Sequence, residues 1–249
     1  MSRALVTGAS AGLGLALARR LLGDGWSVVG VDRDAAEPDG GGHATADLYT
    51  HQLADLSDRA AVDTLAASPD APFDLVVLNA GISATGRFEA IPAEAHGQLL
   101  AVNAEAPLVL ADALLARGLR GTEGRLVLIG SLSVDVGYPG AASYAASKEA
   151  LAAYGRSLAK AGRRVTVVLP GPIRTGHAAR HAPEGASEAG RMDPDDLARR
   201  ILVGAHRGKR VLRPGIGAGA AGLLGRLAPG PVTRAMRRAL FDRLDREVW

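Results

Sequence analysis

The sequence predicts one α/β domain in which a doubly wound parallel sheet carries helices on both faces. Short apolar runs lie at residues 4–7, 27–31, 75–78, 125–129 and 164–169, and helix-period segments lie near 12–23, 58–67, 94–116, 144–161 and 194–206. Strands that alternate with helices are typical of βαβ units, and continuously apolar strands are typical of a sheet buried on both faces. A weaker strand is expected at 210–212. Since no linker divides the chain, residues 1–249 are expected to form a single domain.

Two segments depart from this alternation. Residues 172–195 contain Gly, Pro and His in no clear period, which predicts a flap over a substrate site. Residues 212–249 form an expected C-terminal helical extension. Its apolar side chains could cover the substrate site or a partner subunit, namely Leu223, Leu224, Leu227, Met236 and Phe241. Alternatively, they could lie with Arg234, Arg237 and Arg238 on an anionic membrane surface; the Gly-rich sequence favours the first interpretation.

Composition excludes several classes of protein. The chain has no cysteine, so it has no disulfide and no thiolate metal site. It shows no signal peptide and no run of eighteen apolar residues, which favours a cytoplasmic location. The net charge is +3, but residues 205–249 alone carry +7. That basic tail lacks stacking aromatics and any nucleic-acid motif, so an Arg-rich solvated surface is expected and nucleic-acid binding is not.

A glycine-rich turn joins the first strand to the first helix. Its glycines are Gly8, Gly12 and Gly14, which permit a tight turn and let the backbone approach a pyrophosphate at the helix N-terminus. Asp32 ends the second strand, close to the position of an acid that accepts hydrogen bonds from a ribose. This context predicts a Rossmann-type dinucleotide site.

The same carboxylate bears on the choice of cofactor. Asp32 would repel a 2′-phosphate, and Ala11 offers no cation in the glycine turn, so NAD is expected. Arg33 follows directly and could instead bind a phosphate, which leaves NADP as the alternative.

Tyr144 and Lys148 are spaced to lie on one face of a helix. A phenol has a reference pKa of about 10, and a neighbouring ammonium would lower it, so that the tyrosine could transfer protons near neutrality. Ser131 lies thirteen residues earlier, at the end of a predicted strand, and Asn103 lies in a predicted helix.

These residues together resemble the short-chain dehydrogenase/reductase family over roughly residues 3–206. The glycine turn resembles its TGxxxGxG motif, Asn79-Ala80-Gly81 its NAG motif, and Pro170-Gly171 its PG motif; Leu78 departs from a second Asn that many members carry. The resemblance implies a catalytic tetrad of Asn103, Ser131, Tyr144 and Lys148. It also implies cofactor contacts from Tyr144 and Lys148, and from Gly8, Ser10, Gly12, Leu13, Gly14, Asp32, Arg33, Asp55, Leu56, Asn79, Ala80, Gly81, Pro170, Gly171, Ile173 and Thr175.

The implied activity is interconversion of a secondary alcohol and a ketone or aldehyde, with Tyr144 as general acid or base and Asn103 holding a water of a proton relay. The substrate is expected to be mostly apolar, and the protein a homodimer or homotetramer through the helices near 94–116 and 144–161. A catalytically silent nucleotide-binding regulator or scaffold of the same fold is the alternative. His177 and His181 are spaced for a metal, but no third ligand is evident, and no metal is expected.

Overall fold

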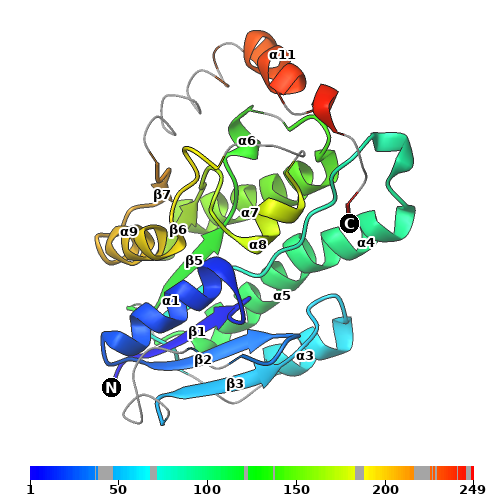
Figure 1. Ribbon diagram of the computed structural model, residues 1–249. Helices are drawn as coiled ribbons and strands as arrows, with labels where there is room; N and C mark the ends of the chain where they lie inside the picture. Colours follow the sequence, from blue (N-terminus) through cyan, green and yellow to red (C-terminus); the bar gives the residue numbers. More distant parts are fainter. Residues whose placement is uncertain are drawn as a thin grey trace.

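Seven parallel strands form one sheet in the computed structural model of the protein, in the order β3-β2-β1-β4-β5-β6-β7 (Figure 1). The strands are β1 Arg3–Thr7, β2 Ser27–Asp32, β3 Tyr49–Leu53, β4 Leu75–Leu78, β5 Arg125–Ile129, β6 Val165–Val168 and β7 Val211–Leu212. The chain winds outward from β1 in one direction and then from β4 in the other. The predicted doubly wound sheet is therefore confirmed, and it has a switch point between β1 and β4, where ligands bind in such sheets.

Helices cover both faces of the sheet (Figure 1). They are α1 Gly12–Gly23, α3 Arg59–Ala67, α4 Ala93–Leu100, α5 Ala106–Ala113, α6 Ser133–Val136, α7 Ala142–Lys160, α8 Gly176–Arg180, α9 Pro194–His206 and α11 Pro229–Ala239. The structure describes residues 1–36, 38, 47–67, 72–120, 123–136, 138–182, 188–215, 225, 227, 229–239, 241–244 and 248–249. Leu223 and Leu224, expected to cover the substrate site or a partner, lie outside these ranges, and the side chain of Met236 is not described.

Two apolar cores lie on opposite faces of the sheet. Side chains of one strand alternate between them, as the pleat of a strand requires: Val127 and Ile129 of β5 face α1 and α9, whereas Leu126 and Leu128 face α5 and α7. Burial on both faces explains why this strand is continuously apolar in sequence.

The edge strand β3 was not predicted. Its sequence is polar, and Leu53 at its end is 64% exposed. The strand pairs with β2 alone, so it needs no continuous apolar run, and the sequence carries little signal for it.

The predicted helix at 94–116 is continuous but contains two π-helical turns, Ala101–Glu105 and Leu114–Gly118. By length and composition alone, the helix Ala93–Ala116 could span a membrane. The sequence did not predict this, because the segment has no unbroken run of eighteen apolar residues. Its length and composition are weak evidence for a span, because the helix packs against α3 and α7 and holds the fully buried Asn103.

The flap contains more structure than the sequence indicated, and the tail contains a helix within the expected extension. The flap includes the short helix α8, and Ile173 forms a bridge with Met192 across its base. The tail includes α11, a 3₁₀ turn at Phe241–Arg243, and a final bridge between Val248 and Thr85. The chain end therefore lies against the loop that follows β4.

Gly155 on α7 provides a test of how tightly this helix packs on the sheet. A Cβ at Gly155 would lie 2.5 Å from Val167 Cγ2 and 2.8 Å from Leu128 Cδ1. Although alanine favours helix, we expect Gly155→Ala to lower the free energy of unfolding by about 1–3 kcal/mol through overpacking. Gly23→Ala is the matched control, because nothing lies within 4 Å of its Cβ position; it should be neutral or stabilise by up to about 1 kcal/mol. Urea denaturation measures both, and equal stability of the two variants would contradict this packing.

Candidate active site

The predicted site residues gather at the carboxyl edge of the sheet. Gly8 follows β1, Asp32 ends β2, Asn79 follows β4, Ser131 lies two residues after β5, and Pro170 lies two residues after β6. Parallel strands end at the same edge, so residues far apart in sequence meet there.

The glycine turn packs closely against the loop that follows β4. Gly8 and Gly12 have φ values of 71° and 52°, which side chains disfavour. A Cβ at Gly14 would lie 1.9 Å from the carbonyl oxygen of Gly8, and a Cβ at Gly8 would lie 2.9 Å from Cα of Ala80. Glycine is therefore required at these positions both for backbone conformation and for close packing.

The residues of the turn fit a pyrophosphate. Helix α1 begins at Gly12, its N-cap residue Ala11 makes no side-chain cap, and its first turn contains no acid. The first backbone N–H groups of the helix thus have no side-chain acceptor, and they lie at the positive end of the helix dipole. Leu13 contributes differently, since its side chain is buried in the core between the sheet and α1.

Thr7 holds the predicted Asn79-Ala80 pair in place. Its Oγ1 accepts hydrogen bonds from the backbone N–H of Asn79 at 2.9 Å and of Ala80 at 3.1 Å. Asn79 Nδ2 donates in turn to the carbonyl of Thr7 at 3.0 Å. Thr7 was part of the recognised motif, but sequence reasoning assigned it no role.

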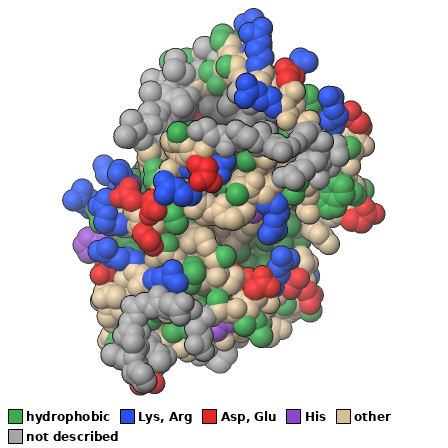
Figure 2. All heavy atoms as spheres, viewed as in Figure 1, with side chains coloured by type: hydrophobic (Ala, Val, Ile, Leu, Met, Phe, Trp, Pro, Cys, Tyr) green, Lys and Arg blue, Asp and Glu red, His purple; other side chains and the backbone are tan. Residues whose placement is uncertain are grey.

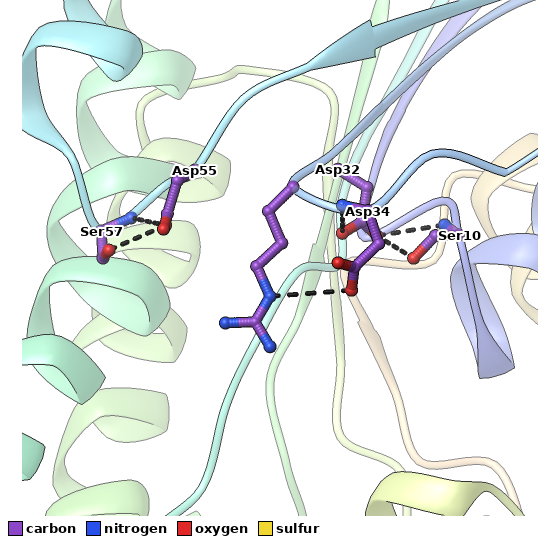
Figure 3. Close-up of polar contacts among 6 residues, drawn as sticks. Ser10, Asp32, Asp34, Asp55 and Ser57 are labelled. Carbon is purple, nitrogen blue, oxygen red and sulfur yellow. Dashed lines mark hydrogen bonds and ion pairs between the residues drawn. The ribbon is translucent and has the colours of Figure 1, made fainter.

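Asp32 is held toward the glycine turn at the end of β2 (Figure 3). Its Oδ2 accepts from the backbone N–H of Ser10 at 3.0 Å and from Ser10 Oγ at 2.7 Å, and its Oδ1 accepts from the N–H of Asp34 at 3.3 Å. Arg33 is exposed and lies 3.7 Å from the exposed Asp34 carboxylate. The Asp32 carboxylate is therefore held in place by hydrogen bonds, whereas the Arg33 guanidinium is only loosely paired with Asp34.

Asp55 and Leu56 have different surroundings. Asp55 Oδ1 accepts from the N–H and Oγ of Ser57 at 2.8 and 2.7 Å, and these bonds lower the pKa of the carboxyl (Figure 3). Leu56 is 8% exposed and packs with Val29 and Val31. Its side chain belongs to the core, a role that the motif alone did not reveal.

The four tetrad residues converge on one place. Tyr144 and Lys148 lie on the same side of α7, with Lys148 Nζ 5.9 Å from the centre of the tyrosine ring. The Ser131 side chain lies close enough to the Tyr144 hydroxyl to lower the pKa of the phenol, and its Oγ accepts from the N–H of Ser133 at 3.2 Å. The side chains of the tyrosine, the lysine and the serine thus form one cluster.

The sequence predicts that Lys148 lowers the pKa of Tyr144, and for the protein alone this direction is wrong. Burial raises the pKa of the phenol, and it outweighs the hydrogen bond from Ser131, which acts in the opposite direction. Tyr138 nearby raises that pKa further. The spacing of Tyr144 and Lys148 in sequence indicates that they are neighbours, but it does not indicate how deeply the phenol is buried.

Lys148 is itself buried, with 4% of its surface exposed. Its Nζ donates to the carbonyl of Ile129 at 3.0 Å, and burial lowers the pKa of the ammonium to about 8. A Cβ at Gly81 would lie 3.0 Å from this Nζ and 3.2 Å from Asn103 Oδ1. The NAG glycine therefore leaves room for the lysine and the asparagine.

Asn103 lies in the first π-helical turn and is fully buried. Its Oδ1 accepts from the N–H of Ile82, and its Nδ2 donates to the carbonyl of Ile82, each at 2.8 Å. Nδ2 also donates to Ser147 Oγ at 3.1 Å. The side chain is occupied in holding the loop after β4, so a relay of protons through Asn103 stays a prediction. Ser147 was missed, because a serine inside a helix carries no signal of such a role.

Further polar side chains lie around Tyr144. His96 Nδ1 and Ser143 Oγ are hydrogen-bonded at 2.6 Å, and Tyr138 is close enough to affect the Tyr144 pKa. Ser133 Oγ is buried and has no hydrogen-bond partner among the residues that the structure describes. Buried hydroxyls are normally paired, so this one is available to a bound molecule.

The flap contacts the cofactor end of the site. Thr175 caps α8 by accepting from the N–H of Ala178 at 3.2 Å, and its Cγ2 would lie 3.1 Å from a Cβ at Gly12. Pro170 accepts a hydrogen bond from the N–H of Leu132 at 2.9 Å, so the loops after β5 and β6 are joined; Gly171 follows, and Ile173 packs against the core. The rings of His177 and His181 lie 4.8 Å apart, but no group of three potential metal ligands occurs in the described ranges.

Comparison with known proteins assigns the family. The model of the short chain dehydrogenase family matches residues 2–185. The chain belongs to the short-chain dehydrogenase family. Among similar curated proteins, the 3-oxoacyl-[acyl-carrier-protein] reductase FabG of Escherichia coli is 31% identical over 183 residues, covering 69% of this chain and 73% of that protein.

Two further relatives of this short-chain dehydrogenase are informative. The 2-(R)-hydroxypropyl-CoM dehydrogenase of Xanthobacter autotrophicus is 35% identical over 190 residues, covering 70% of this chain and 76% of that protein. A short-chain dehydrogenase from Sphingobium yanoikuyae, solved in complex with NADPH, superimposes with a TM-score of 0.76 at 26% identity and covers 99% of this chain and 97% of its own. The family and the Rossmann-like fold are thus confirmed, and the chain is an oxidoreductase by family.

A buried ion pair anchors the segment that follows Ser131. The Asp135 side chain on α6 is fully buried, and its carboxylate accepts from Arg213 Nε at 2.7 Å and from Arg213 Nη2 at 3.2 Å. Arg213 directly follows β7, so this pair ties the segment after β5 to the far edge of the sheet. Sequence reasoning missed it, because the partners are 78 residues apart.

Breaking this pair should be costly. We expect Arg213→Met to lower the free energy of unfolding by about 3–5 kcal/mol, because it leaves a buried carboxylate without its main cation. The double variant Asp135→Asn, Arg213→Met should recover part of that loss. Arg20→Met removes the exposed pair with Asp24 and should cost less than about 1 kcal/mol. Equal losses for Arg213→Met and Arg20→Met in urea denaturation would contradict the anchoring role.

Proposed function

We propose that this short-chain dehydrogenase interconverts a secondary alcohol and a ketone or aldehyde with a nicotinamide dinucleotide, and that Tyr144 transfers the proton. The observation that carries the proposal is the cluster at the carboxyl edge of the sheet: Ser131 lies beside the Tyr144 hydroxyl, and the buried Lys148 lies beside the tyrosine ring. The glycine turn and Asp32 lie at the same edge. A bound nicotinamide supplies the hydride donor or acceptor.

Each residue of the cluster has a distinct task. Ser131 Oγ hydrogen-bonds the substrate oxygen and stabilises charge that develops on it. Tyr144 Oη donates a proton to that oxygen in reduction and takes one from it in oxidation. Lys148 remains fixed by its bond to the Ile129 carbonyl, and its charge favours the phenolate whenever Tyr144 loses its proton.

Tyr144 can serve the reaction in either direction. Burial raises the pKa of the phenol, so it holds its proton at neutral pH in the protein alone. The similar FabG protein is named a reductase and the Xanthobacter autotrophicus protein a dehydrogenase.

For the cofactor we propose NAD, on the basis of Asp32. Its carboxylate is held at the end of β2, where it can accept hydrogen bonds from a ribose diol and repel a 2′-phosphate. Two observations favour NADP instead: Arg33 is exposed and only loosely paired, and the Sphingobium yanoikuyae structure contains NADPH. The preference for NAD or NADP therefore depends on whether repulsion by Asp32 or attraction by Arg33 dominates at the ribose 2′ position.

The packing of the tail supports the proposal that it covers an apolar substrate. The Phe241 ring stacks on Phe88 at 5.6 Å, and Leu244 Cδ1 would lie 2.5 Å from a Cβ at Gly140. Thr85, which pairs with Val248, also hydrogen-bonds His181 of the flap at 3.1 Å. Loop, flap and tail thus meet beside Tyr144. This packing favours a cover over the substrate site rather than a membrane-binding tail, although Leu227 is 74% exposed.

Two further properties follow from the family. We propose a homo-oligomer formed through α4, α5 and α7, where Leu100 leaves an apolar side chain 46% exposed, and we propose action on a small molecule in the cytoplasm. The competing function is a silent nucleotide-binding scaffold, which would bind dinucleotide without turnover. A screen of secondary alcohols and ketones with NADH, NADPH and their oxidised forms separates the two.

Tyr144→Phe tests the proton-transfer step. We expect kcat to fall by about 10²–10⁴-fold or more, because the general acid is lost, while NADH binding followed by nucleotide fluorescence is nearly unchanged. Tyr154→Phe alters another tyrosine of the same helix and should retain activity. Retention of near wild-type turnover by Tyr144→Phe would disprove the mechanism. Dinucleotide binding without turnover in the wild type would favour the scaffold.

Asp32→Ala tests the choice of cofactor. It should weaken NADH binding by about tenfold or more and strengthen NADPH binding, because it removes a ribose acceptor and a source of repulsion. Arg33→Ser should weaken NADPH binding alone. The same fluorescence titration measures both variants. If NADH binding is unchanged in Asp32→Ala while Arg33→Ser abolishes NADPH binding, the protein is an NADP enzyme.

A further inference from the structure

A basic depression lies at the amino edge of the sheet, opposite the carboxyl edge that holds Tyr144. It encloses about 350 Å³ where β5 and β6 begin and where α7 and α9 end. Its lining residues include five arginines and one histidine: Arg125, Arg163, Arg164, Arg207, Arg210 and His206. We name this set the Arg pocket. No Asp or Glu is among the residues that line it.

Most of this charge is not neutralised. Arg164 pairs with Glu123, and Arg125 Nη1 donates to the carbonyl of Ala205 at 2.8 Å. The guanidinium groups of Arg163, Arg207 and Arg210 have no hydrogen bond or ion pair with any residue in the described ranges. Three cations therefore converge on one depression without a counter-charge from the described part of the chain.

Several arginines elsewhere in the protein are paired with acidic side chains. On α9 itself, Arg199 and Arg200 both bind Asp196, at 2.5 and 2.7 Å. Figure 2 shows basic and acidic side chains interspersed along this flank of the molecule. Interspersed charge is the usual arrangement of a surface, because clustered like charges repel one another. The Arg pocket departs from it.

Helix dipoles account for only part of this cluster. Arg163 and Arg207 follow the C-termini of α7 and α9, where the helix dipole favours a cation. Arg125 begins β5, but its Nη1 donates to the carbonyl of Ala205 in the last turn of α9, so it too is stabilised by a helix end. Arg164 and Arg210 directly precede β6 and β7, and within the described ranges their side chains form no hydrogen bond with a helix end.

The backbone around the pocket is held rigidly. Gly162 and Gly208 adopt φ values of 85° and 69° in the two turns that lead from helix to strand. Thr166 Oγ1 donates to the carbonyl of Lys209 at 2.7 Å, and the N–H of Val167 donates to the carbonyl of Arg210 at 2.9 Å. The two turns therefore keep a fixed separation, and the pocket needs little rearrangement to bind a ligand.

We propose that the Arg pocket binds a small anion that carries linked phosphate groups, such as pyrophosphate, tripolyphosphate or the polyphosphate of a nucleotide. Guanidinium groups bind phosphate oxygens through paired N–H donors, and several of them match a ligand of several charges. The volume is at the small end of the range for small-molecule sites. No Phe, Tyr or Trp side chain lines the pocket.

The test uses tripolyphosphate as the probe and the full-length protein, at constant ionic strength. Isothermal titration calorimetry should show one tripolyphosphate per chain. The double variant Arg163→Ser, Arg210→Ser should bind about 100-fold more weakly, because each charge-assisted contact is worth roughly tenfold. Arg199→Ser, an exposed arginine of α9 outside the pocket, should bind as the wild type does.

Three controls make the result decisive. Saturating NADH should leave tripolyphosphate binding intact; if it abolishes binding, the probe occupies the glycine turn and the proposal is wrong. Tripolyphosphate should raise the Tm of the wild type but not that of the double variant. Without tripolyphosphate, the Tm of the double variant should be no lower than that of the wild type. A titration with ATP against inorganic tripolyphosphate distinguishes a nucleotide from a free polyphosphate as the source. Unchanged binding by the double variant, or binding of DNA or an acidic protein without tripolyphosphate, would overturn the proposal.

Discussion

The hydrogen bond from the Lys148 ammonium to the Ile129 carbonyl joins helix α7 to the sheet. Ile129 ends β5, and Ser131 lies two residues further on, so this bond places α7 relative to the loop that carries the serine. Tyr144 lies one turn earlier on the same helix and is thereby positioned against Ser131. A buried ammonium is costly without a partner, and the free carbonyl at the end of the strand offsets that cost. The cluster therefore depends on where β5 ends.

The fold could be predicted from sequence where burial on both faces of the sheet leaves a continuous apolar run. Leu126 and Leu128 face one core and Val127 and Ile129 the other, so this strand was evident, whereas the half-exposed β3 was not. The site residues could be placed because their motifs lie at strand ends, and all strand ends of a parallel sheet share one edge. Burial depth and contacts between distant residues leave no local signal. The raised pKa of Tyr144 and the bond between Asp135 and Arg213 were missed for that reason.

The two edges of the sheet differ in charge for a common structural reason. At the carboxyl edge, the first N–H groups of α1 point toward the site, and Asp32 adds a carboxylate that is held by Ser10. At the amino edge, α7 and α9 present the negative ends of their helix dipoles, and arginines accumulate beside them. The alternation of strand and helix thus creates one edge of helix N-termini and one of helix C-termini. The excess of arginine at the second edge is greater than the helix ends require.

The substrate side of the site is built from segments that carry no family motif. Thr85 connects them, since its backbone pairs with Val248 of the tail and its hydroxyl bonds His181 of the flap. Burial lowers the pKa of His181 to about 4, so this imidazole is neutral at physiological pH and the contact is uncharged. Neutral, closely packed surroundings are also what raises the pKa of Tyr144. The same burial that would exclude water from an apolar substrate therefore also keeps the phenol protonated in the protein alone.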